Sequence, residues 1–118
     1  MKRTIYSLLL VTAGLTACDE VDVAKDTPTC VRTKVEELAQ QAPCKTDANT
    51  IGASVKEYWF QNQTVYVLDY GSCIADGSAT VISENCQKLG FLGGFGGNTT
   101  VNGEPFANAE YKRTIWQQ

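Results

Sequence analysis

The segment VKEYWFQNQTVYVLDY, residues 55–70, decides the fold. It holds two runs rich in β-branched and aromatic residues, which predict two adjacent strands. Gln61 and Asn62 stand between the runs, and Asn tolerates the positive φ that a two-residue hairpin turn requires. Apolar side chains alternate onto both faces of this predicted hairpin, so we expect both faces to be partly covered.

The flanking segments predict a small α+β domain. Residues 30–41 predict a helix on which Val31, Val35, Leu38 and, just beyond it, Ala42 recur at helical spacing, and Pro43 ends that helix. Residues 79–83 predict a third strand and residues 110–116 a last one, whereas LGFLGGFGGN at 89–98 predicts a glycine-rich loop. We therefore expect residues 30–118 to form a single domain. One amino-terminal helix packs on an antiparallel sheet of three to four strands, braced by two disulfides.

The amino terminus has the features of an export signal. Lys2 and Arg3 precede a mostly apolar run over residues 5–15, which is shorter than the roughly 20 residues of a spanning helix. Residues 15–18, LTAC, resemble the lipobox of bacterial lipoproteins, in which the cysteine receives a diacylglycerol. We expect a signal peptide over residues 1–17 and lipidation of Cys18, since two or more acyl chains anchor a protein stably. The alternative is a plain secretory signal beside an ordinary cysteine.

Residues 18–29 predict an acidic tether after the lipidated cysteine. Four carboxylates and few core-forming side chains favour a solvated spacer. Acidic residues at this place resemble surface-export signals, and Asp beside the cysteine resembles an inner-membrane retention signal. We expect a lipid-anchored protein of the cell envelope, at the outer membrane, with its periplasmic or surface face left open.

The cysteine count favours disulfides over a metal site. Without Cys18, four of the five cysteines remain, and an oxidising compartment favours two bonds among Cys30, Cys44, Cys73 and Cys86. Their spacings of 14, 29 and 13 residues exceed those of zinc ligand pairs, and the chain has no histidine, so we expect no metal.

The pairing of these cysteines stays open at this point. A bond from Cys30 to Cys44 needs a nearly complete chain reversal at the end of the helix. We therefore favour bonds from Cys30 and Cys44 into the 73–86 segment. The local pair Cys73–Cys86 is a close rival.

The residue types give little support for catalysis. The commonest general base is missing because the chain has no histidine. Asp69, Asp76 and Glu84 are candidate carboxylates, but two of them adjoin predicted turns, where such side chains bond locally. Asp76, Glu84 and Asn85 match no calcium-binding loop. We expect no enzyme, no metal and no cofactor.

The net charge and the glycine-rich loop limit the classes of partner that the sequence favours. Without Lys2 and Arg3, eight basic residues face 13 acidic ones, a net charge of −5 that argues against nucleic acid. The glycines of the loop match neither a P-loop nor a dinucleotide fingerprint. Phe91, Leu92 and Phe95 either tuck back onto the sheet or form an exposed contact patch for another protein.

Several segments together resemble a family of small exported lipoproteins of Gram-negative bacteria, a domain of unknown function. The resemblance covers nearly all of residues 30–118 and is carried by CVRTKVEEL from Cys30, VKEY from Val55, TVYV from Thr64, Gly71–Cys73, Cys86, LGGFGGN from Leu92, Asn102–Gly103 and Ile115–Trp116. It implies export and a cystine-braced fold, and no catalytic residue or cofactor. We expect a non-catalytic binding or accessory module, held at a membrane by its lipid, with an envelope protein as partner. The alternative is an inhibitor of an exported enzyme, by analogy of fold.

Overall fold

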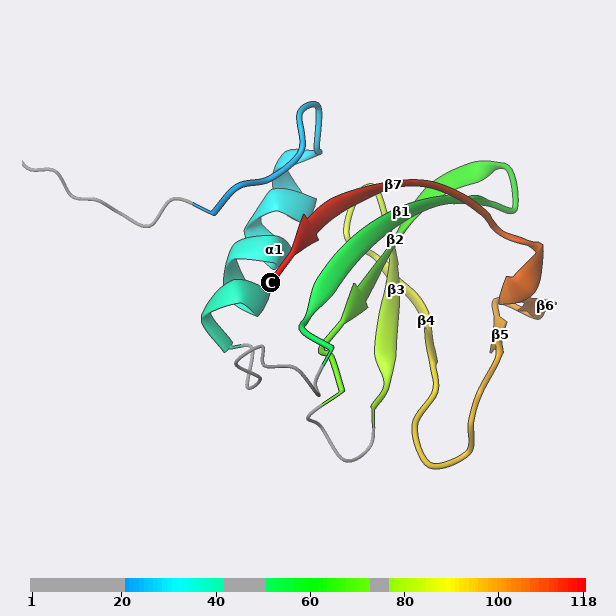
Figure 1. Cartoon of the computed structure of the whole chain (residues 1–118). Helices are drawn as coiled ribbons and strands as arrows, with labels where there is room; N and C mark the ends of the chain where they lie inside the picture. Colours follow the sequence, from blue (N-terminus) through cyan, green and yellow to red (C-terminus); the bar gives the residue numbers. More distant parts are fainter. Residues whose placement is uncertain (1–20, 42–50, 73–76) are drawn as a thin grey trace, which may run out of the picture.

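The computed structural model describes residues 21–41, 51–72 and 77–118 (Figure 1). One antiparallel sheet has the strand order β4-β3-β2-β1-β7, and α1 lies on one of its faces. A separate two-stranded ribbon pairs β5 with β6. The elements in chain order are α1 (Thr29–Gln41), β1 (Ser54–Phe60), β2 (Gln63–Asp69), β3 (Ala79–Ser83), β4 (Lys88–Leu92), β5 (Thr100–Val101), β6 (Glu104–Pro105), the 3-10 turn η1 (Phe106–Asn108) and β7 (Glu110–Gln117).

The predicted hairpin is confirmed as β1 and β2. Phe60 pairs with Gln63, so only two residues make the turn. Both have positive φ, 54° at Gln61 and 60° at Asn62, as a right-twisted two-residue hairpin requires. The hairpin occupies the centre of the sheet, with β3 on one side and β7 on the other.

The predicted strand count is wrong, because the sheet has five strands rather than three or four. The additional strand β4 occupies residues 88–92, most of which had been assigned to the glycine-rich loop. Glycine at position 90 has a packing reason: a Cβ there would lie 3.3 Å from Cγ1 of Val101. Gly90 therefore lets β5 close over the sheet without interrupting the strand.

Apolar side chains cover both faces of the sheet, as expected. On one face α1 buries Val31, Val35 and Leu38, which confirms these three residues of the predicted helical stripe, whereas Ala42 lies outside the described residues. Their partners on the sheet are buried hydrophobic residues of four elements: Val55, Tyr66, Leu68, Ile82 and Ile115. The opposite face has its own core, formed by Phe60, Val65, Val67, Ala79, Val81 and Val101.

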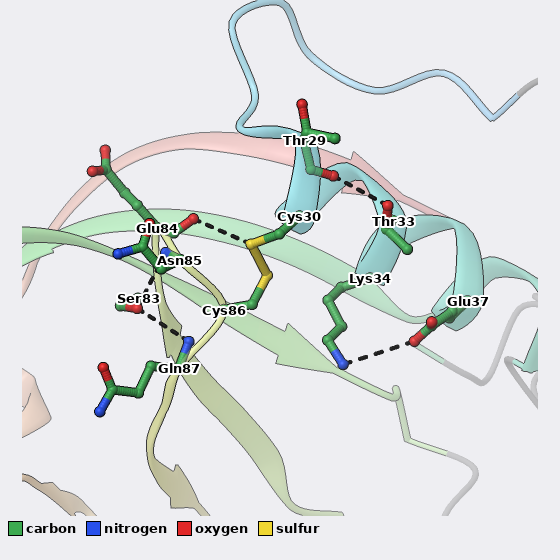
Figure 2. The surroundings of a disulfide bond; sticks show 10 residues. All are labelled: Thr29, Cys30, Thr33, Lys34, Glu37, Ser83, Glu84, Asn85, Cys86 and Gln87. Atoms are coloured by element: carbon green, nitrogen blue, oxygen red, sulfur yellow. Dashed lines mark hydrogen bonds and ion pairs between the residues drawn. A yellow bond between two sulfur atoms is a disulfide. The ribbon is translucent and has the colours of Figure 1, made fainter.

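A disulfide joins the first turn of α1 to the turn after β3 (Figure 2). It links Cys30 to Cys86 with 6.1 Å between the Cα atoms and a sequence separation of 56. This agrees with the favoured pairing of Cys30 into the 73–86 segment, and it excludes both a Cys30–Cys44 bond and a Cys73–Cys86 bond. Cys18, Cys44 and Cys73 lie outside the described residues, so the second predicted disulfide is not described.

The side chain of Ser83 stabilises the turn that carries Cys86. Ser83 Oγ accepts hydrogen bonds from the backbone N–H groups of Asn85, at 3.2 Å, and Gln87, at 3.1 Å (Figure 2). The N–H of Cys86 also donates to the Ser83 carbonyl, and Cys86 itself has a positive φ of 67°. These bonds direct the Cys86 side chain toward the helix.

The described part of the expected tether is packed against the domain. We call residues 21–25 the stem. The N–H of Ala24 donates to the Ile115 carbonyl at 3.0 Å, and Arg113 Nη1 donates to the Lys25 carbonyl at 2.8 Å. Val21 and Val23 contact the helix-side core. The free edge of β7 offers unpaired backbone groups, so the stem docks there instead of forming a solvated spacer.

Candidate contact surface

The connection between β4 and β5 is a closed hairpin with a phenylalanine at its tip. We call residues 93–98 the tip. Gly93 and Asn98 exchange two backbone hydrogen bonds, of 2.8 and 3.1 Å, and the N–H of Gly97 donates to the Gly94 carbonyl at 3.1 Å. Phe95 lies between these bonds with 93% of its surface exposed. The tip thus holds an aromatic side chain in water on a backbone that is fixed by its own hydrogen bonds.

Glycine is required at the base of the tip. Gly93 has φ of 84°, and a Cβ there would lie 2.7 Å from the Gly77 carbonyl oxygen. The Asn98 side chain donates from Nδ2 to the carbonyls of Phe91 and Thr100, which ties the tip to both flanking strands. The glycines of LGGFGGN therefore allow the positive φ angles of this turn, and the Asn98 bonds hold the turn in place.

The structure separates the three residues of the predicted contact patch. Phe95 is exposed at the tip, and Phe91 is 46% exposed on β4, where it pairs with Thr80. Leu92 is half-buried and packs against the core on the other face. Two of the three residues are therefore available for contact, and the third supports the sheet.

A groove that no local sequence pattern signals lies between α1 and the sheet. Its volume is about 290 Å³, and Leu38, Leu68 and Ile82 supply apolar walls. Lys34 and Lys88 also line it, and Lys34 Nζ lies 3.9 Å from Oε1 of Glu37. Its lining comes from four elements, so only the placement of the helix on the sheet creates it.

The opposite face carries a shallow, more open depression of about 470 Å³. Tyr58 and Phe106 border it, with their ring centroids 5.1 Å apart in an edge-to-face arrangement. Burial raises the pKa of the Tyr58 hydroxyl, and the neighbouring Tyr111 and Asp69 raise it further. Tyr58 is therefore neutral at physiological pH and offers an apolar ring with a polar edge.

An ion pair and a tyrosine share one row of the helix-side face. Arg113 Nε donates to Oε1 of Glu57 at 2.8 Å, and this hydrogen bond raises the pKa of Arg113. Glu57 pairs with Tyr66 on the next strand. Burial, together with the negative charges of Glu57 and Glu84, raises the pKa of Tyr66 to about 12.

Tyr66 should make the protein sensitive to alkali. In the unfolded chain its pKa is about 10, so between pH 10 and 12 the unfolded state binds fewer protons than the folded state. The contribution of Tyr66 to stability is therefore present below pH 10 and lost as the pH rises to about 12. We expect the free energy of unfolding, measured with urea from pH 8 to 12, to fall more steeply for the wild type than for Y66F. Parallel curves would contradict the assignment.

The two candidate catalytic carboxylates that the structure describes, Asp69 and Glu84, do not form a pair. Asp69 Oδ1 accepts the N–H of Gly71 at 2.9 Å, which is a local turn bond. Asp69 pairs with Ala79 at the start of β3, whereas Glu84 follows the end of that strand, so the two lie at opposite ends of the sheet. Asp76 lies outside the described residues, so the structure does not describe the full set of candidate calcium ligands, Asp76, Glu84 and Asn85.

The described ranges contain no group of three or more His, Cys, Asp or Glu side chains placed to hold a metal ion. Within those same ranges, no helix combines the length and the apolar character needed to cross a membrane.

Comparison with known proteins yields one match. A family described as a domain of unknown function (DUF6970) matches residues 40–118, a span that includes all seven strands of the described residues. This agrees with the expected kinship to an uncharacterised family. The match includes Cys86 and the tip, whereas Cys30 and most of α1 precede it. No curated protein and no solved structure matches the chain.

Proposed function

Because this chain belongs to the DUF6970 family of domains of unknown function, we propose its role from its own residues. It is an exported lipoprotein of the cell envelope, held at the outer membrane by acyl chains on Cys18. There it serves as a non-catalytic binding or accessory module. The tip, together with Phe91, is its contact surface.

The exposure of Phe95 is the observation that carries this proposal. A phenylalanine with 93% of its surface in water gains from burial against another molecule. Its hairpin is already fixed by two bonds between Gly93 and Asn98, so little backbone entropy is lost on contact. Among the described carboxylates, Asp69 bonds within a turn, and Glu37, Glu57 and Glu110 each form an ion pair.

Crosslinking from the tip tests the contact. A photoreactive phenylalanine analogue placed at position 95 should form adducts with a lipid or protein of the envelope. The same analogue at Lys112, an exposed position beside Glu110 on β7, is the matched control and should form few. Equal adduct yields at both positions would refute the tip as the contact surface.

The lipid anchor has its own test. We expect mass spectrometry of the mature chain to find an amino-terminal Cys18 carrying acyl groups, and the wild type to sediment with membranes. The C18S chain should lose the modification and move to the soluble fraction. An unmodified amino-terminal segment in the wild type would contradict the anchor.

A second disulfide between Cys44 and Cys73 completes the proposal. Cys86 is bonded to Cys30 and Cys18 is acylated in this proposal, so these two thiols remain to pair in an oxidising compartment. Gln41 and Tyr70 line the same groove, and each stands three residues, or about 10 Å of extended chain, before one of these cysteines. Peptide mapping without reduction should recover a 44–73 crosslinked peptide. Free thiols at both positions would contradict this pairing.

The braced tip also favours a second candidate function, inhibition of an exported enzyme. A rigid loop with a projecting side chain can enter a cleft with little rearrangement. In a screen against envelope hydrolases, inhibition that is lost in F95A would favour this function. Inactivity of the wild type against all of them would exclude it for the enzymes tested.

A further inference from the structure

The stem reaches the domain at a defined end of the sheet. Ala24 bonds to Ile115 and Lys25 to Arg113, so the stem runs antiparallel to β7. Followed back toward Val21, it therefore approaches the carboxyl end of β7 at Gln117. In Figure 1 the described chain enters beside the upper half of α1, to the left of the arrowhead of β7.

The strand register shows which other segments share that end. Gln117 pairs with Ser54, Ser54 with Asp69, Asp69 with Ala79, and Ala79 with Leu92. These five residues form one row across the sheet. We call this row, together with the described residues that continue past it at the same end of the sheet, the stem end. The tip follows Leu92 directly, so Phe95 projects from the same end at which the stem enters.

Two large apolar side chains are exposed at the stem end. Ile51, three residues before Ser54, is 71% exposed, and Phe95 is 93% exposed. Residues 51–53, 69–72, 77–79 and 92–99, all of which the structure describes, contain one Asp and no Glu, Lys or Arg, and the stem adds Asp22 and Lys25. The opposite end carries Glu84, Glu104, Glu110 and Lys112, with Trp59 and Tyr111 exposed among them.

We propose that the stem end rests on the bilayer that holds the anchor, with Phe95 and Ile51 inserted among the lipid headgroups. This inference rests on the proposed lipidation of Cys18 and names the partner of the proposed contact surface. Val21 is only three residues from Cys18, so at most about 10 Å of chain separates the acyl chains from the packed stem. Four strand spacings of about 4.8 Å separate β4 from β7 by roughly 19 Å across the sheet.

The chemistry of the stem end fits a neutral lipid surface. Aromatic and aliphatic side chains gain free energy when they are buried in the interfacial region of a bilayer, and this gain does not require anionic headgroups. Glycine and serine around Phe95 let the backbone approach the headgroups closely. The charged residues at the opposite end then face water.

Tryptophan quenching tests the orientation. The lipidated full-length chain is reconstituted in phosphatidylcholine vesicles whose acyl chains carry bromine, a quencher of indole fluorescence. The variant F95W/W59F/W116F holds its only indole at the tip. The variant W116F keeps only Trp59, at the opposite end, and is the matched control. We expect quenching at the tip to exceed quenching of Trp59 several-fold, with a blue shift on vesicle binding.

Hydrogen exchange of the unsubstituted lipidated chain gives a second readout that needs no variant to fold. On the same vesicles, the amides of residues 51–53 and 93–98 should exchange more slowly than in the unlipidated C18S chain. The turn at residues 61–62 should be unchanged.

The outcomes separate this inference from the proposed function. A mature chain that lacks acyl groups and does not float with vesicles would refute both. A chain that floats while the tip stays unquenched and unprotected would overturn the bilayer contact alone. If such a tip instead crosslinks to a protein in intact envelopes, the contact surface stands and its partner is that protein, which also overturns the inference.

Discussion

Removal of the Cys30–Cys86 bond by the double substitution C30A/C86A is expected to lower the free energy of unfolding by about 4 kcal/mol. The bond joins residues at a sequence separation of 56, and the loss of chain entropy in the unfolded state scales with the logarithm of the loop length. Domains of this size have stabilities of roughly 5 to 15 kcal/mol, so the variant should lie near the limit of folding. Urea denaturation under oxidising conditions measures the difference.

The loss should be concentrated at the helix. In the described residues α1 is held on the sheet by the disulfide and by its buried stripe, Val31, Val35 and Leu38. Hydrogen exchange should therefore accelerate in α1 of the variant before it does in β1 and β2. The single substitutions C30A and C86A should each cost about as much as the double one, because either breaks the same bond. Wild-type stability in the double variant would refute the importance of this bond.

The substitution F60A is expected to cost about 3 to 5 kcal/mol, which is the range for phenylalanine truncation in a packed core. Phe60 is 1% exposed, and its ring centroid lies 4.9 Å from that of Phe106. Val101 belongs to the same buried cluster, so the cavity would open beneath the β5–β6 ribbon and η1. The expected change is a fall in the midpoint of urea denaturation, together with faster exchange over residues 100–108.

The matched control for this substitution is F95A. It removes the same atoms from a side chain that is exposed in the isolated protein, so it should change stability by no more than about 0.5 kcal/mol. A comparable cost at both positions would contradict the assignment of Phe60 to the core and Phe95 to the surface. If the F95A chain is folded, a loss of binding in this variant can be attributed to the missing Phe95 side chain.

Local patterns were sufficient for the hairpin and the helix. The alternation of residues 55–70 and the turn at Gln61–Asn62 depend on neighbours within a few positions, and so does the stripe Val31, Val35, Leu38. The expected export to an oxidising compartment and the four cysteines other than Cys18 likewise predict disulfides without any structure. The strand at residues 88–92 was not predicted because Gly90 is typical of a loop. Position 90 requires glycine because Val101, which is distant in the chain, packs against it.

The contact surface depended on the tertiary structure. A register shift between Val81 and Ile82 places Gly90 opposite Val81 and Lys88 opposite Ile82, so simple alternation cannot assign Phe91 and Leu92 to a face. The prediction therefore left open whether these residues are buried or exposed. The pairing of β4 with β3, together with the packing of Val101 on one face of the sheet, leaves Phe91 exposed and Leu92 half-buried.

The sequence by itself determined the class of the domain, its central hairpin, its helix and the expectation of export and cystine bracing, because each of these depends on residue type and short spacing. The tertiary structure decided the fifth strand, the partner of Cys30, the docking of the stem and the end of the sheet from which Phe95 projects. These features arise from contacts between segments far apart in the chain. Only the assembled sheet places the stem and the tip at one end, and no local pattern encodes that geometry.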